Sequence, residues 1–182
     1  MGLTICINRN NYADNTQISN RNRLLSASHY QQKQNVMFDY KEIERTVNDN
    51  HLPFQKIGDV DKEILIQRLY DTFVIGNPRA LWLSFKYVPY SIDCNMEDPY
   101  FRLLDVIDKN IVLYFFIDYW NKDFIIYKAR MSDIHRFIGD CEGLDEYYLV
   151  TEDFMELYSI TDHDDLLYID VRKNEMRVDN KA

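Results

Sequence analysis

The sequence predicts an α+β fold, in which a mainly antiparallel sheet of four to six strands has helices packed on one side. Three observations support this prediction. Apolar residues recur every four positions within 61–74, as in a helix, whereas 111–120 and 124–130 are runs of β-branched and aromatic residues typical of strands. Strands and helices do not alternate strictly, and no Gly-rich loop follows a strand, so a doubly wound nucleotide-binding sheet is unsupported.

The first two helices are predicted from their ends and their apolar spacing. Asp39 and Glu42 form a capping-box pattern, in which each side chain satisfies a free N–H of the first turn. A second helix opens at Asp61 and closes at Gly76 and Pro78, because Gly accepts the left-handed conformation and Pro cannot continue a helix.

The middle of the chain predicts strands around one short helix. Residues 80–88 are rich in side chains that favour strands. Asp98 and Pro99 offer an N-cap followed by Pro at the first helical position. The runs 111–120 and 124–130, joined by a polar turn, then predict a hairpin.

The last part of the chain predicts two helices and two strands. Ser132 is expected to cap a helix that stops at Gly139. Residues 146–150 predict a strand, and Thr151 is expected to cap a short helix. Residues 166–171 predict the last strand.

The composition predicts a folded domain with two polar ends. With 46% hydrophobic residues the chain can form a core, which excludes wholesale disorder. Residues 1–36 are polar and predict a loosely held arm, 37–175 a single domain, and 176–182 a flexible tail. No stretch approaches the roughly 18 apolar residues that span a bilayer, and the N-terminus does not resemble an export signal.

The three cysteines are widely spaced and include no C-x-x-C pair. Unpaired cysteines in a chain without an export signal fit a reducing cytoplasm, so we expect a cytoplasmic protein. The cysteines are Cys6, Cys94 and Cys141. Cys141 has acidic sequence neighbours, which disfavour the thiolate, so we reject it as a nucleophile.

The negative charge is concentrated in one segment. The net charge is −9, but residues 137–170 contain 11 acidic residues and no Lys or Arg. Aromatic and aliphatic residues alternate with these acids, which indicates folded structure rather than a disordered acidic tail. The segment therefore predicts one strongly negative face, which is either an ordinary solvated surface or a site that attracts a basic partner. So acidic a chain is a poor binder of nucleic acid.

Two short stretches carry a resemblance to a known class of proteins. They are residues 146–151, with the sequence EYYLVT, and residues 163–167, with the sequence HDDLL. This pattern resembles small bacterial proteins that are similar to immunity proteins of polymorphic or contact-dependent toxin systems. The resemblance covers roughly residues 60–171 and implies a cytoplasmic partner-binding protein without inherited catalytic residues.

Our leading hypothesis is an immunity-like or antitoxin-like protein that occludes a basic toxin, such as a nuclease. Carboxylates would mimic the phosphates that the toxin binds, and neighbouring aromatic side chains would fill its pockets. The expected partner-binding residues are Glu152, Asp153, Glu156, Asp162, His163, Asp164, Asp165, Tyr147 and Tyr148. We expect no cofactor, no membrane partner and no nucleic-acid partner.

Two alternatives remain open at this stage. Asp162, His163, Asp164 and Asp165 could ligate a divalent metal, which would make the protein a small metal-dependent hydrolase. Against this, consecutive residues point in different directions, so few of them can share one ion. The other alternative is a non-catalytic structural or regulatory interaction module.

Overall fold

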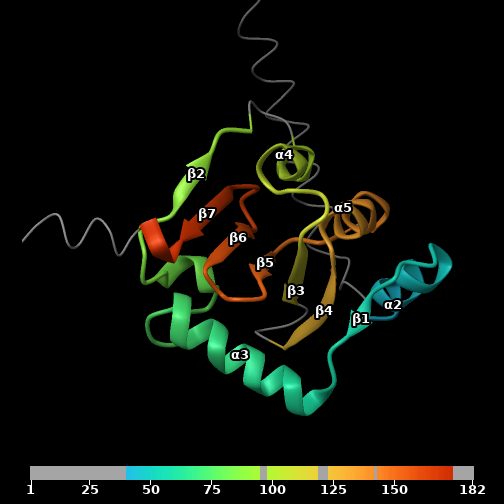
Figure 1. The fold of residues 1–182 in the computed structure, drawn as a ribbon, viewed down its shortest axis with the longest axis horizontal. Coiled ribbons are helices and arrows are strands. Elements are labelled where there is room, and N and C mark those ends of the chain that lie inside the picture. Colours follow the sequence, from blue (N-terminus) through green and yellow to red (C-terminus); the bar gives the residue numbers. More distant parts are fainter. Residues whose placement is uncertain (1–39, 95–97, 119–122, 142, 174–182) are drawn as a thin grey trace, which may run out of the picture. The chain divides into compact units, whose positions relative to one another are not determined.

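The computed structural model describes residues 40–94, 98–118, 123–141 and 143–173, which hold four α-helices and seven strands (Figure 1). The predicted arm, residues 1–36, and the predicted tail, residues 176–182, lie outside the described residues. Within the described part of the chain, no helix combines the length and the apolar character needed to cross a bilayer.

One antiparallel sheet joins the seven strands in the order β1-β4-β3-β5-β6-β7-β2. The strands are β1 (Gln55–Lys56), β2 (Tyr90–Ile92), β3 (Val112–Asp118), β4 (Phe124–Arg130), β5 (Tyr147–Thr151), β6 (Glu156–Ile160) and β7 (Leu166–Asp170). The α+β class and the antiparallel sheet are therefore confirmed. The sheet exceeds the expected four to six strands because the edge strands β1 and β2 are only two and three residues long, too short for a periodic pattern.

Helices cover both faces of the sheet, which corrects the prediction that they pack on one side. The helices are α2 (Tyr40–Asp49), α3 (Asp59–Phe73), α4 (Pro99–Val106), α5 (Met131–Asp140) and the 3-10 helix η1 (Leu81–Ser84). Helices α2, α4 and α5 share a core with one face, whereas α3 and η1 share a core with the other. The reason lies in the central strand β3, where Phe115 and Phe116 point to opposite faces and both are fully buried.

Several predicted ends and turns are confirmed. Helix α4 begins as expected, because Pro99 occupies its first turn and the Asp98 carboxylate accepts a hydrogen bond from the backbone N–H of Tyr100 at 3.1 Å. The predicted hairpin is formed by β3 and β4. The strands predicted at 146–150 and 166–171 are β5 and β7.

Other predicted ends are shifted by a few residues. Helix α3 begins at Asp59 rather than Asp61 and ends at Phe73, because Val74 already forms an isolated bridge with Phe85. Helix α5 begins at Met131 and ends at Asp140. The predicted cap Ser132 and the predicted stop Gly139 therefore both lie inside α5.

Two predicted elements are wrong. The strand expected at 80–88 is replaced by η1 and its flanking loops. The helix expected after Thr151 is a tight turn, in which Phe154 has a φ of 62° and the Thr151 hydroxyl accepts the backbone N–H of Glu156 at 3.0 Å. The chain thus reverses directly into β6, because these contacts satisfy the turn without a helix.

Candidate functional site

The predicted partner-binding acids fall into two groups at opposite ends of β6. Glu152 and Asp153 lie in the turn before this strand, and Glu156 begins it. The second group, Asp162–Asp165, lies in the turn after the strand. Since β6 has five residues, it separates the two groups by about 16 Å. The prediction that all these acids share one face is therefore wrong.

The acids at the β5–β6 turn are neutralised within the fold by cations from other segments. Glu152 pairs with Lys128 on β4, and Glu156 pairs with Arg172 just after β7. Asp153 accepts hydrogen bonds from the Thr151 hydroxyl at 2.6 Å and from the backbone N–H of Met155 at 3.1 Å. The Thr151 hydrogen bond, with smaller contributions from the backbone, lowers the pKa of Asp153. The side chains of Glu152, Asp153 and Glu156 therefore stabilise the turn and its neighbouring strands.

Tyr147 and Tyr148 are core residues, so their predicted role as partner-contacting side chains is wrong. They are 3% and 0% exposed, because β5 lies in the middle of the sheet with helices on both faces. Tyr147 packs edge-on against Phe115, with ring centroids 5.7 Å apart, whereas Tyr148 faces α3 and η1. A sequence of consecutive aromatic residues does not distinguish a strand buried on both faces from one buried on a single face.

One end of the sheet gathers carboxylates from five segments of the chain. The strand register places a row of paired residues across this end, namely Ile117, Tyr147, Ile160, Leu166 and Ile92. Acidic residues lie just beyond this row. We call the following residues the acidic end: Asp93, Asp98, Asp118, Glu146, Asp162, Asp164 and Asp165. They come from the end of β2, the start of α4, the end of β3, the start of β5 and the β6–β7 turn.

These carboxylates are close enough to affect one another and the buried groups beneath them. Burial raises the pKa of Tyr147, and the charges of Asp98 and Asp164 raise it further. Burial also raises the pKa of the Cys94 thiol, with an added contribution from Asp93. Residues far apart in the sequence therefore contribute to one region of negative potential.

Glu146 is the most strongly perturbed carboxyl group of the acidic end. Its pKa is raised to about 7, mainly by burial; the hydrogen bond from Tyr148 opposes the rise, and the charge of Asp118 adds to it. The Tyr148 hydroxyl donates to Glu146 and accepts the backbone N–H of Leu81 at 3.2 Å. Glu146 is therefore partly protonated at neutral pH and is linked through Tyr148 to the first residue of η1.

The β6–β7 turn carries the exposed part of the acidic end. Asp162 pairs with Arg79 at 3.4 Å, and His163 lies edge-on to Trp82 with ring centroids 5.6 Å apart. Asp164 has a φ of 61°, a conformation that Asp and Asn tolerate better than most residues. The side chains of Asp164 and Asp165 are exposed, and among the described residues no cation pairs with either.

The geometry does not fit the predicted metal site. Among the described residues, no three His, Cys, Asp or Glu side chains are grouped in a way that could hold a metal ion. His163 is exposed, and its Nε2 lies 3.8 Å from Asp162, but its ring rests on Trp82. Burial raises the pKa of the Cys141 thiol to about 11, in agreement with its rejection as a nucleophile.

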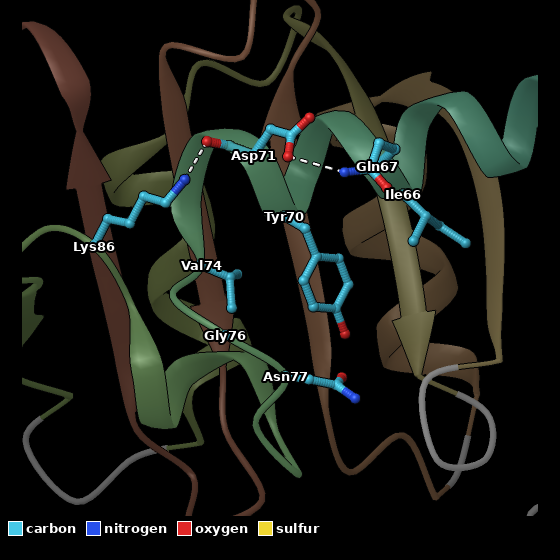
Figure 2. Close-up of a pocket in the computed structure, with 8 residues that line it drawn as sticks. All are labelled: Ile66, Gln67, Tyr70, Asp71, Val74, Gly76, Asn77 and Lys86. Atoms are coloured by element: carbon cyan, nitrogen blue, oxygen red, sulfur yellow. Dashed lines mark hydrogen bonds between the residues drawn. The ribbon is translucent and has the colours of Figure 1, made fainter.

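A pocket of about 450 Å³ lies beside the C-terminal half of α3 (Figure 2). Ile66 and Val74 supply apolar walls, and the Gln67 amide donates to the Asp71 carboxylate at 2.9 Å. The Tyr70 hydroxyl points toward Asn77 on the opposite wall. The Lys86 ammonium also lines the pocket and donates to the carbonyl oxygen of Asp71, so the pocket combines apolar walls with polar groups of both charges.

Sequence reasoning missed Asp93, Asp98 and Asp118 as members of the acidic end. Each lies at the end of a different element, and only the pairing of distant strands brings these ends together. The available signal was positional: Asp118 closes the longest apolar run of the chain, and Glu146 directly precedes another strand. The pocket had no sequence signal.

Comparison with known proteins gives one match. The model of a family described as "Family of unknown function (DUF6756)" matches residues 39–180, a range that includes every described helix and strand. No curated protein and no solved structure matches the chain.

Proposed function

The chain belongs to the DUF6756 family of unknown function, and we propose that it is a non-catalytic, immunity-like or antitoxin-like protein. In this proposal the acidic end binds and occludes a basic protein, such as a toxin nuclease, in the cytoplasm. The observation that carries the proposal is the convergence of seven carboxylates from five segments at one end of the sheet. Asp93, Asp98 and Asp118 lie outside the acidic segment 137–170, so the full group is assembled only when the sheet forms.

The charge of the acidic end suits recognition of a cationic surface. Asp164 and Asp165 project from a turn whose shape is held by the Thr161 hydroxyl, which accepts the backbone N–H of Asp165 at 3.2 Å. A turn backbone held in this way loses little conformational freedom on binding. They would attract a basic partner from a distance and would increase its association rate at low salt.

Occlusion would follow from the position of the carboxylates. A nuclease active site presents cations that bind phosphate groups, and Lys or Arg can pair with a carboxylate instead. The protein would therefore inhibit by competing with the substrate, without any reaction of its own. The absence of a metal-ligand group among the described residues favours this function over the metal-dependent hydrolase.

Co-expression with the candidate toxin tests the proposal. If a gene adjacent to that of this protein encodes a toxin with a basic terminal domain, the wild-type protein should protect cells that express this domain. The variant D164N/D165N should lose at least about tenfold in affinity for the purified domain, because two charge contacts at an interface are removed. Asn retains the size of Asp and tolerates the conformation of residue 164.

A matched variant separates local from general charge effects. Asp49, at the end of α2, and Asp108, before β3, are exposed and lie away from the acidic end. The variant D49N/D108N removes the same charge and should bind like the wild type. Equal losses in both double variants, or the absence of a basic protein among the products of adjacent genes, would contradict the proposal.

A further inference from the structure

The outward side of α3 carries two exposed apolar residues one helical turn apart. Val60 is 76% exposed and Ile64 is 60% exposed, whereas Leu65, Leu69 and Phe73 on the inward side are buried. The inward residues already supply the contacts of α3 with the sheet core. Val60 and Ile64 therefore contribute nothing to that core and remain available to a partner.

Both cations in the body of α3 interact with neighbouring segments of the fold. Lys62 pairs with Asp123, with 2.7 Å between Nζ and Oδ1. The Arg68 guanidinium lies 4.2 Å from the ring centroid of Phe154 and donates to the carbonyl oxygen of Asp153 at 2.9 Å. These contacts pair Lys62 with a carboxylate and hold the exposed Arg68 against the β5–β6 turn.

The charge left on the outward side is negative. Asp59, Asp61 and Glu63 are exposed and flank the two apolar residues. Among the described residues, no cation pairs with these three carboxylates. Asp59 and Asp61 also stabilise the start of the helix through its dipole, but Glu63 lies beyond the first turn.

The pocket beside α3 extends the same surface toward the C-terminal end of the helix (Figure 2). Gln67 and Asp71, which follow Ile64 along the exposed side, form part of its lining. From Asp59 to Asp71 the surface extends about 18 Å, or between three and four helical turns. The surface thus combines an apolar pair with flanking carboxylates, and it ends at a pocket whose Lys86 ammonium disfavours a basic side chain there.

We propose that the outward side of α3 is a docking surface for an amphipathic helix of a partner protein that is rich in Lys and Arg. Leucine-like residues of that helix would cover Val60 and Ile64, and its basic side chains would reach the flanking carboxylates. A second copy of this chain is a poor occupant, because two such surfaces would bring like charges together. An anionic membrane is repelled for the same reason. This surface is separate from the acidic end, and the proposal does not rest on the proposed function.

Two synthetic peptides test this docking surface on the full-length protein. The first is a fluorescent helix of about 18 residues made of Leu, Ala and Lys, with its leucines on one side. The second has the same composition, with the leucines distributed around the helix. Fluorescence anisotropy should give at least about tenfold tighter binding of the first peptide, because general charge attraction is equal for both.

Two variants locate the binding. V60A/I64A should abolish the difference between the peptides; Ala favours a helix more than Val or Ile, so the loss cannot come from unfolding of α3. F101A/L104A removes another exposed apolar pair, 55% and 41% exposed, from α4 and should retain the difference. Equal binding of both peptides, equal loss in both variants, or a wild-type dimer that V60A/I64A converts to a monomer in sedimentation would overturn the proposal.

Discussion

Replacement of Glu146 by Gln tests the central electrostatic feature of the acidic end. Burial, reinforced by the charge of Asp118, raises the pKa of Glu146 from 4.5 to about 7. The folded state therefore binds this proton more tightly than the unfolded state does. The resulting stabilisation is fully present below pH 4.5 and is lost as the pH rises through 7. Gln is neutral at every pH and can still accept the hydrogen bond of Tyr148, so E146Q should not show this loss.

The magnitude follows from the size of the pKa difference. A rise from 4.5 to about 7 corresponds to about 3 kcal/mol at about 1.4 kcal/mol per pH unit. Because the Glu146 side chain remains partly accessible to water, solvent screening reduces this value, and we expect about 1–2 kcal/mol over the whole titration.

Urea denaturation followed by tryptophan fluorescence from pH 5.5 to 8.5 measures the effect. The free energy of unfolding of E146Q should exceed that of the wild type by an amount that grows by about 1 kcal/mol over this range. Groups common to both proteins cancel in this difference. E63Q, which alters an exposed glutamate on α3, is the control and should give a difference that does not vary with pH. A flat difference for E146Q, or a decrease with pH, would refute the reasoning.

Two further predictions concern hydrogen bonds that hold individual elements in place. Y148F removes the acceptor of the Leu81 backbone N–H. It should lower the free energy of unfolding by about 1–3 kcal/mol in urea denaturation at pH 7. A loss below about 0.5 kcal/mol would mean that the hydroxyl does not hold η1 on the sheet. D98A removes the cap of α4 and should lower the free energy of unfolding by about 1 kcal/mol in the same assay. D98N retains an acceptor and should lower it less. Equal losses in the two variants would argue against the capping contact.

Local signals in the sequence predicted much of the fold. Asp98 and Pro99 specified the start of α4, and the paired apolar runs specified the β3–β4 hairpin, because both depend on neighbouring residues alone. The prediction for residues 80–88 was wrong because side chains that favour strands also suit a packed 3-10 helix. There, the contact of Leu81 with the core and with Tyr148 decided the local structure.

The candidate site was less predictable than the fold. The acidic residues near Asp164 were identified correctly as a concentration of charge, but the sequence could not tell which of them would meet cations from other segments. Lys128 on β4 pairs with Glu152 across the intervening strand β3, and Arg172 pairs with Glu156 across the β6–β7 pair, so these contacts exist only once the sheet has formed. For the same reason Asp118 joins the acidic end although it lies outside the acidic segment.

The two ends of β6 differ in how their negative charge is compensated. At the β5–β6 turn the fold supplies cations, as the pairs of Glu152 and Glu156 show. At the acidic end Arg79 pairs with Asp162, but Glu146 retains a proton near neutral pH, at a cost in stability as the pH rises. A basic partner would supply the missing positive charge and would favour the ionised form of Glu146. The proposed function therefore implies opposite trends with pH: the stability of the free protein falls through pH 7, while its affinity for a basic partner rises. A purely structural role for these carboxylates accounts for the first trend but not for the second.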